Sequence, residues 1–412
     1  MATSTSDRRR FLIGAAACPL ALTAGNAANA RGIPPTFKAP GVYVEEVPSG
    51  VRSITGVKTG VCLLIDHFGD AVPDHVPIEL FGTDTLSPVA ADAVEAERLA
   101  RFNLEQVFDQ GGRSAVIINV PLTPDGLPDY DAGLATAMAD DALIFDILYF
   151  PSVFRILQNS ELRMTGLYRA AADWCTDQMA ILILDAPDTI MEAARWARYV
   201  APQSVDAIAY GARIVSPADP ALVAGAGGAA AGIIARTDRL RGVWKAPAGL
   251  SADLTGLSLA SAPSQKTRDI LSASYNINTL IKATDGAPVL WGARTLGGSA
   301  LSAEYRYVST RRLHHYIHRS LSQGLAWTAF EPNEKALWNT VTLAVSAFMQ
   351  NLFVQGAFAG ATARQSYTVA CGINTMTAAD QLAGRLMLEI GFAPARPAEF
   401  VILRMAFDVQ SA

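Results

Sequence analysis

The sequence contains few cysteines, and none of them forms a closely spaced pair. Its 412 residues include Cys18, Cys62, Cys175 and Cys371, which are scattered along the chain. Structural zinc sites use paired ligands at short spacing, and small disulfide-rich domains use many more cysteines, so neither class fits. We expect the last three cysteines to be small, buried apolar side chains.

Basic clusters and long apolar runs are also scarce. The net charge is −5, and no run of lysine and arginine offers a footprint for phosphates, which argues against a nucleic-acid partner. Beyond the N-terminal leader, no uninterrupted apolar segment reaches the length of about 20 residues that a membrane-spanning helix needs. We therefore expect the mature chain to be soluble.

Motifs for catalysis, cofactors and metals are missing as well. The glycine-rich stretch at 225–232 follows a proline-broken segment, and Asp238 comes too soon after it, so helix packing is expected there instead of dinucleotide binding. His314 and His318 share a helical face but have no third ligand, and Asp185 is expected to form a turn. Since a serine-hydrolase motif is also lacking, the sequence predicts no enzyme, no cofactor and no metal.

Residues 1–30 resemble a twin-arginine export signal. Arg8 and Arg9 precede an apolar run at 11–24, and a small-residue end is suited to cleavage after Ala30. An uncut N-terminal extension is the alternative.

An extended arm at 31–60 follows the leader. It is rich in proline and glycine and contains a short strand, 42–47, between Pro40 and Pro48. This strand has no obvious partner in its own chain, so we predict that it pairs with another subunit. The residues of this predicted inter-subunit strand are Val42, Tyr43, Val44, Glu45, Glu46 and Val47.

Strands and helices alternate through the next region, 61–290. Apolar runs such as SAVIINV and AILILDAP alternate with helical stretches, which predicts an α/β domain with a mostly parallel sheet between layers of helices. The region 291–412 is predicted as a second, α+β domain with two long helices, the second of them capped by Asn333. It continues with a strand, a helix at 377–390 and a final strand.

The final strand alternates between apolar and polar side chains. Its apolar face carries Val401, Leu403, Met405, Phe407 and Val409, and its other face carries Arg404 and Asp408. A long terminal strand left as a free edge promotes aggregation, so we predict that it pairs with the strand 42–47 of a neighbouring subunit. The predicted inter-subunit residues here are Val401, Leu403, Arg404, Met405 and Phe407.

Three long segments carry a resemblance to a known family. They are the arm APGVYVEEVPSGVRSITGVKTGV, the segment AGIIARTDRLRGVWKAPAG, and a C-terminal stretch that runs from LWGARTL through YRYVSTRRLHHYIHRSL to IGFAPARPAEFVILRM. Together they resemble, in family order, the contractile tail sheath proteins of bacteriophages, tailocins and contractile injection systems. The similarity covers nearly everything after Gly32.

This resemblance implies a structural protein with a subtilisin-like α/β core that lacks protease activity. Subunits of such sheaths form hexameric rings that stack helically around an inner tube, and contraction drives the tube through a target envelope. The implied partners are other copies of the chain, the tube protein, and baseplate and terminator proteins, without nucleic acid and without membrane contact by the sheath itself. Assembly is expected in the bacterial cytoplasm, as part of a virion or phage-tail-like particle.

The resemblance also implies a surface that faces the tube. We predict that the helix at 377–390 supplies it, with Leu382, Leu386 and Ile390 directed inward. The predicted tube-facing charges are Asp380, Arg385 and Glu389, together with Arg396 in the following turn.

The leader does not fit this family, because sheaths polymerise around a tube inside the cell. Two alternatives are an exported α/β enzyme and a secreted, repurposed sheath homologue. The missing catalytic motifs and the two predicted arms favour the sheath subunit.

Overall fold

The computed structural model describes residues 52–215, 219–261, 263–284, 286–297, 304–395 and 401–410. These residues belong to one compact unit, Gly50–Ala412. The leader at 1–30 and the strand at 42–47 lie outside the described residues, so their roles stay predictions.

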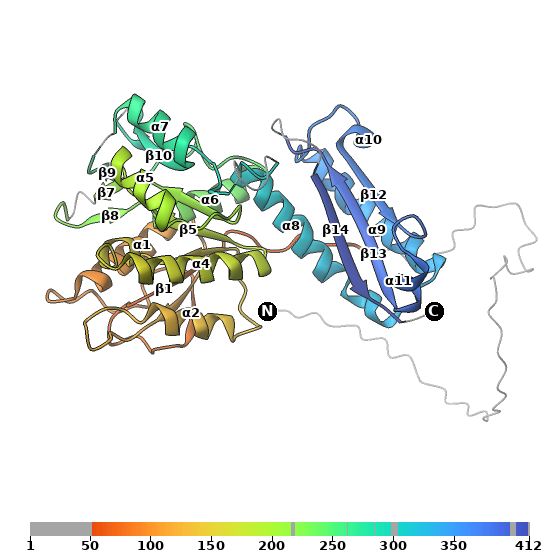
Figure 1. Cartoon of the computed structure of the whole chain (residues 1–412), viewed down its shortest axis with the longest axis horizontal. Coiled ribbons are helices and arrows are strands. Elements are labelled where there is room, and N and C mark those ends of the chain that lie inside the picture. Colours follow the sequence, from red (N-terminus) through yellow and green to blue (C-terminus); the bar gives the residue numbers. More distant parts are fainter. Residues whose placement is uncertain are drawn as a thin grey trace, which may run out of the picture. The chain divides into compact units, whose positions relative to one another are not determined.

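An eight-stranded sheet forms the centre of the first part of the chain (Figure 1), in the order β11-β10-β6-β5-β4-β1-β3-β2. Its strands are β1 (Cys62–Asp66), β2 (Pro77–Leu80), β3 (Ala115–Asn119), β4 (Ile147–Tyr149), β5 (Ile181–Asp185), β6 (Ala207–Tyr210), β10 (Ile277–Lys282) and β11 (Pro288–Trp291). The inner strands pair in parallel, whereas β2 and β11 pair antiparallel at the two edges. The predicted α/β class is confirmed, and the sheet is mixed.

Helices cover both faces of this sheet. They are α1 (Glu95–Asp109), α2 (Tyr130–Met138), α3 (Val153–Ile156), α4 (Glu161–Asp177), α5 (Ile190–Tyr199), α6 (Gly227–Arg241) and α7 (Gln265–Tyr275). In β1, Leu63 and Ile65 pack into one apolar core with α2, α4 and α5, and Cys62 and Leu64 pack into another with α1 and α6. Burial on both faces explains why the strands are continuous apolar runs.

The glycine-rich stretch at 225–232 runs from a short strand, β8 (Val223–Gly225), into α6. A Cβ atom on Gly232 would lie 2.6 Å from the carbonyl oxygen of Val107 in α1, and one on Gly228 would collide with the carbonyl of Asn103. The missing side chains therefore let α6 approach α1 closely, which confirms the predicted packing role. The strand β8 also pairs with β7 (Arg213–Val215), which pairs with β9 (Ser258–Leu259) in a small sheet.

Two of the cysteines behave as predicted. Cys62 and Cys175 are fully buried free thiols in the two cores of the large sheet. Cys371 is also free but only half-buried.

The last part of the chain builds a separate three-stranded sheet, which we call the C-terminal sheet, against long helices (Figure 1). Its elements are α8 (Val308–Gly324), η1 (Ala326–Phe330), α9 (Lys335–Val354), α10 (Ala363–Ser366), β12 (Tyr367–Cys371), α11 (Ala378–Leu382), β13 (Arg385–Phe392) and β14 (Val401–Asp408). The strands lie in the order β12-β13-β14, all antiparallel. A third apolar core joins Ile317 of α8, Val345 of α9 and Leu388 of β13, and Ile54 from the end of the predicted arm packs into it. Within the described ranges, no helix is both long and apolar enough to cross a membrane.

The predicted helix at 377–390 is wrong. The helix α11 ends at Leu382, Gly384 takes a positive φ of 67°, and the strand β13 begins at Arg385. Glycine accepts this left-handed conformation without the steric cost that a side chain brings, so it marks the break between the two elements.

The apolar spacing in β13 has the period of a strand. Leu386, Leu388 and Ile390 are buried at every second position, and the residues between them are more exposed. The predicted inward stripe therefore divides: Leu386 and Ile390 are indeed buried, but Leu382 is 79% exposed at the end of α11. A helical spacing of four residues also satisfies a period of two, which is why the pattern was ambiguous.

The helix α9 begins one residue later than predicted. Its N-cap residue is Glu334, and Asn333 instead connects the helix to the C-terminal sheet. The Asn333 side chain donates to the backbone oxygen of Arg385 at 3.2 Å and accepts from Trp338 Nε1 at 2.8 Å.

Candidate interaction surface

The strand β14 belongs to the subunit's own sheet. It pairs with β13 along its whole length, from Arg385 opposite Asp408 to Phe392 opposite Val401. The predicted alternation is confirmed, because Val401, Leu403 and Met405 are buried in the third core and Phe407 is half-buried against it. These apolar side chains stabilise their own subunit, so any role of β14 between subunits falls to its other edge.

The outer edge of β14 is open over four residues. Val409 N donates to Gly384 O on the β13 side at 2.7 Å. Because successive residues of a strand direct their backbone groups to opposite edges, the N–H and C=O groups of four residues point away from β13. These residues are Ile402, Arg404, Ala406 and Asp408. Within the described residues, their outward backbone groups have no hydrogen-bond partner.

Beyond these four residues, the outer edge of β14 is covered by two backbone hydrogen bonds of Gln410. Gln410 N donates to Glu331 O, and Asn333 N donates to Gln410 O, each at 3.1 Å. The segment after η1 therefore occupies the edge position beside Gln410 and leaves the edge free before it.

Two ion pairs lie on the outward face of the C-terminal sheet. Arg404 Nε in β14 contacts Glu389 Oε2 in β13 at 3.0 Å, directly across the strand pair. Arg385, four residues before Glu389 on the same face, contacts Asp380 Oδ1 of α11 at 2.9 Å. The structure thus brings the predicted charges Asp380, Arg385 and Glu389 to one face, whereas Arg396 lies outside the described residues.

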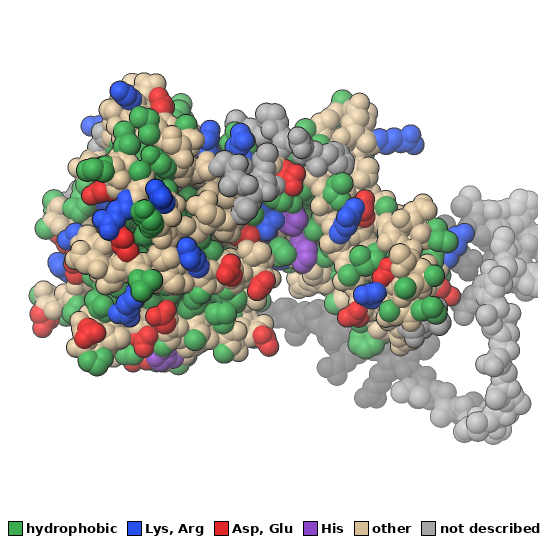
Figure 2. All heavy atoms as spheres, viewed as in Figure 1, with side chains coloured by type: hydrophobic (Ala, Val, Ile, Leu, Met, Phe, Trp, Pro, Cys, Tyr) green, Lys and Arg blue, Asp and Glu red, His purple; other side chains and the backbone are tan. Residues whose placement is uncertain are grey.

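The short helix α11 is fixed by a capping box. The Thr377 hydroxyl accepts from Asp380 N at 3.1 Å, and the Asp380 carboxylate accepts from Thr377 N at 3.0 Å. Hydrogen bonds from Thr377 lower the pKa of Asp380, so it is ionised at neutral pH. Leu382 and, in the preceding loop, Ile373 are 79% and 73% exposed. Figure 2 shows acidic, basic and apolar side chains interspersed over the visible surface of this part.

The helix α8 is joined to the first part of the chain by buried ion pairs. Arg311 makes a bidentate contact with Asp206, at 2.6 Å and 2.8 Å. Burial alone would raise the pKa of Asp206, but contacts with His315 and Arg311 lower it. Arg312 lies between two carboxylates, those of Asp146 and Asp238, each at 2.5 Å.

These arginines were missed by the sequence reasoning. The doublet lies in the family segment RRLHHYIHRSL, for which the sequence analysis predicts no buried ion pair. A usable signal exists, because Arg312 follows the buried apolar Val308 by four residues and so shares its face of the helix. Arginine is the cation best suited to such buried carboxylate pairs.

His314, His318 and Asp185, the candidate metal-binding and catalytic residues of the sequence, make other contacts in the structure. His314 Nδ1 lies 2.8 Å from the Tyr305 hydroxyl, and its ring stacks on that of His318. Burial lowers the pKa of His314 to about 2, so it is neutral. Among the described residues, no group of three histidines, cysteines or carboxylates could hold a metal ion. Asp185 does not serve a local turn, since its buried carboxylate accepts from the Tyr149 hydroxyl and from Gly227 N.

Comparisons with known proteins point to one class. Residues 302–408 match the family model described as the phage tail sheath C-terminal domain. A putative prophage major tail sheath protein of Pseudomonas aeruginosa (strain UCBPP-PA14) is 27% identical over 379 residues, covering 87% of this chain and 94% of that protein.

Solved structures agree over nearly the whole chain. The helical sheath of the anti-feeding prophage in its contracted state matches with a TM-score of 0.70 and 26% identity, covering 89% of this chain and 98% of that one. A chain of the anti-feeding prophage baseplate matches with a TM-score of 0.68 and 27% identity, covering 90% and 99%.

The fold and these matches define a structural protein of contractile, phage-tail-like particles. Residues 302–408 match the sheath family model, and nearly the whole chain is similar to contractile tail sheath proteins, which supports a structural sheath subunit.

Proposed function

We propose that the chain polymerises into hexameric rings that stack around an inner tube, and that contraction of this sheath drives the tube through a target envelope. The open edge of β14 is the observation that carries the proposal. An unpaired strand edge is a template for another strand, and this edge offers backbone groups on Ile402, Arg404, Ala406 and Asp408.

The occupant of this edge is the strand 42–47 of a neighbouring subunit. Its six residues suit the span of the open edge, and main-chain hydrogen bonds supply the affinity in this mode of strand addition. The side chain of Arg404 is 71% exposed, and the alternation of a strand would direct one of the two neighbouring acids, Glu45 or Glu46, to the same face of the sheet. Each subunit then gives one strand and receives another, which links the subunits into a continuous lattice.

The tube-facing surface consists of α11 and the outward face of β13. The exposed Leu382 supplies an apolar contact, and Asp380, Arg385 and Glu389 supply charges around it. Exposed ion pairs are individually weak, but repetition around and along a sheath multiplies their effect. Arg396 is assigned to the same surface by its place in the sequence.

The other partners are baseplate and terminator proteins at the two ends of the sheath. Similarity to a chain of the anti-feeding prophage baseplate supports contact with the former. The region 61–290 is the subtilisin-like, non-catalytic domain and 291–412 the C-terminal sheath domain, and the particle assembles in the bacterial cytoplasm. Residues 1–30 act as an uncut extension or are removed.

Electron microscopy of the purified full chain tests the proposal. We expect cylinders or stacked rings of sheath subunits, alone or with tube protein. A preparation that stays monodisperse and monomeric at all concentrations, with tube protein present, contradicts it. That result would favour the secreted, repurposed homologue or an exported enzyme.

A further inference from the structure

The helix α9 has an exposed face without charged side chains. Between Lys335 and Arg364 the sequence contains no aspartate, glutamate, lysine, arginine or histidine. The helix takes up Lys335–Val354 of this span, and residues such as Val345 and Leu352 bury its other face in the third core. A surface helix ordinarily carries charged residues opposite its apolar stripe, whereas a helix that is apolar all round is usually buried.

Exposed side chains of α9 line up along one side of the helix, in what we call the neutral stripe. It consists of small, apolar and amide side chains, namely Ala336, Asn339, Leu343, Ala347, Gln350 and Val354. Spacings of three and four residues place them on the same side of the helix. Leu343 is 58% exposed and Val354 is 74% exposed, so the apolar members of the stripe face solvent in the isolated subunit.

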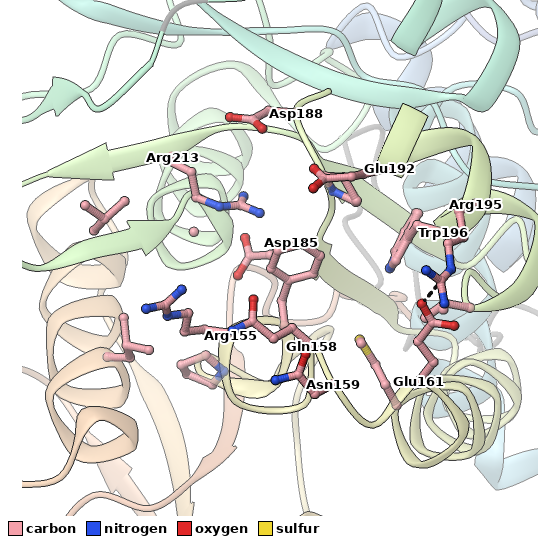
Figure 3. A pocket seen from close by; sticks show the side chains of 18 residues that line it. Arg155, Gln158, Asn159, Glu161, Asp185, Asp188, Glu192, Arg195, Trp196 and Arg213 are labelled. Carbon is pink, nitrogen blue, oxygen red and sulfur yellow. Dashed lines mark ion pairs between the residues drawn. The ribbon is translucent and has the colours of Figure 1, made fainter. Parts of the chain in front are cut away.

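The helix α5 gives the contrast. It has ten residues against twenty in α9, and yet its exposed side carries Glu192, Arg195 and Arg198. Figure 3 shows Glu192 and Arg195 beside a cavity of about 400 Å³, where Arg195 contacts Glu161 at 3.0 Å. A shorter helix on the surface of the same chain is thus charged, and the neutral stripe departs from that composition.

The relief of the neutral stripe suits packing against another apolar surface. Small and large side chains alternate along it, in the order Ala336, Leu343, Ala347 and Val354. Projecting side chains and the gaps between them are what packed helices interlock. Depletion of charged residues is also the composition found at the centre of protein–protein interfaces.

The neutral stripe begins at the corner where a neighbouring subunit is proposed to bind. Asn333 N donates to Gln410 O at 3.1 Å, beside the open edge of β14, and α9 starts two residues later. A copy that adds its strand to β14 therefore lies next to the first turn of α9. The charged surface assigned to the tube lies on the other face of the C-terminal sheet, because β13 directs Leu388 toward α9 and Glu389 away from it.

We propose that the neutral stripe of α9 binds a second copy of this chain, in addition to the exchange of strands. The proposal rests on the proposed self-assembly and adds a second contact to it. The surface that the stripe meets on the other copy is uncharged and mainly apolar, since a charged one would lose its water without gaining a counter-charge.

Site-specific photo-crosslinking of the full chain tests the proposal. Benzoylphenylalanine replaces Leu343, and the chain is irradiated under assembly conditions with tube protein present. We expect covalent dimers of the chain, identified by mass spectrometry, and none from a dilute sample that sediments as a monomer. Cross-links to tube protein alone, or no cross-linked dimer, overturn the proposal.

Added charge measures the contribution of the stripe. Glutamate is a good helix former, so we expect Leu343→Glu at this exposed site to leave the melting temperature of the monomer unchanged. The contact would bury an unpaired charge, so the variant should need about tenfold or more protein to assemble. Met191→Glu places the same charge at an 82% exposed position of α5 and should raise that concentration less than about twofold. Equal shifts in the two variants refute the assignment, and if Leu343→Glu does not fold, the cross-linking result decides.

The two proposals fail in different ways. Sheaths that form without cross-links from position 343 keep the proposed function and refute this contact. Cross-linked small oligomers in a preparation that forms no cylinders or rings refute the stacked sheath and keep this contact. A chain that shows neither refutes both.

Discussion

Arg312 of α8 donates to the carboxylate of Asp146, the residue immediately before β4, at a distance of 2.5 Å. The same carboxylate accepts from the backbone N–H groups of Gly60 and Val61, at 3.0 Å and 2.7 Å. Asp146 thus connects the segment that leads into β1 with α8, the helix at the start of the C-terminal part.

This arrangement predicts a large effect of replacing Arg312. The variant Arg312→Gln leaves the buried carboxylates of Asp146 and Asp238 without their cation, and breaking one side of a buried pair costs about 3–5 kcal/mol. We expect the free energy of unfolding in urea to fall by that order. Arg404→Gln is the matched control, because its pair with Glu389 is exposed and is worth about 0–1 kcal/mol. Equal losses of unfolding free energy in the two variants would show that the buried pairs of Arg312 with Asp146 and Asp238 do not stabilise the fold.

The open edge of β14 predicts that proline at one position blocks assembly. Ala406 is exposed and directs its N–H away from β13, so Ala406→Pro removes a donor of the edge without removing a hydrogen bond to β13. We expect the subunit to fold and to lose the ability to form long sheaths in sedimentation assays. Ala406→Val, which keeps the N–H, should assemble. Normal sheaths from the proline variant would show that the edge is not the junction.

Deletion of the two ends should have opposite effects on the isolated subunit. Removing residues 31–50 spares Ile54, which packs into the third core, so we expect an unchanged melting temperature and no polymer. Removing residues 399–412 takes away Val401, Leu403 and Met405. Their burial contributes about 1.5–3 kcal/mol each, so we expect an unfolded C-terminal part. Long sheaths from the first deletion, or a folded product of the second, would disprove this division of roles.

The buried acid at the end of β1 predicts a dependence of stability on pH. Burial raises the pKa of Asp66 to about 7, although Ser152 and the backbone of His67 donate to it. In the unfolded chain the pKa is about 3.9. The folded form therefore holds a proton between these values that the unfolded form has lost, and stability falls as pH rises from about 4 to about 7.

Asp66→Asn removes this titration. The slope attributable to Asp66 is at most about 1.4 kcal/mol per pH unit. We expect the parent to lose stability relative to the variant between pH 5 and pH 7 in urea titrations. Parallel curves for the two proteins would exclude Asp66 as the source.

The sequence predicted an element correctly where its apolar periodicity fitted only one type of secondary structure. The buried strands of the large sheet and the alternation of β14 follow directly from their apolar patterns, as in Ile181–Asp185 and Val401–Asp408. It failed at 377–390, because leucines four residues apart satisfy both a helix and a strand. The β13–β14 pairing, which shows that β14 is part of its own core, depends on a contact that no local pattern encodes. The pairing of Arg311 and Arg312 with distant acids was hidden for the same reason.

The helix α8 has a mechanical consequence. Arg311 and Arg312 near its beginning fasten it to acids beside the large sheet, and Leu313, Ile317 and Leu321 fasten the same helix into the core beneath β14. A force applied to the edge of β14 therefore reaches the large sheet through the packing and ion pairs of α8. If neighbouring subunits bind this edge as proposed, their pull would move the whole subunit and would not detach the C-terminal sheet alone.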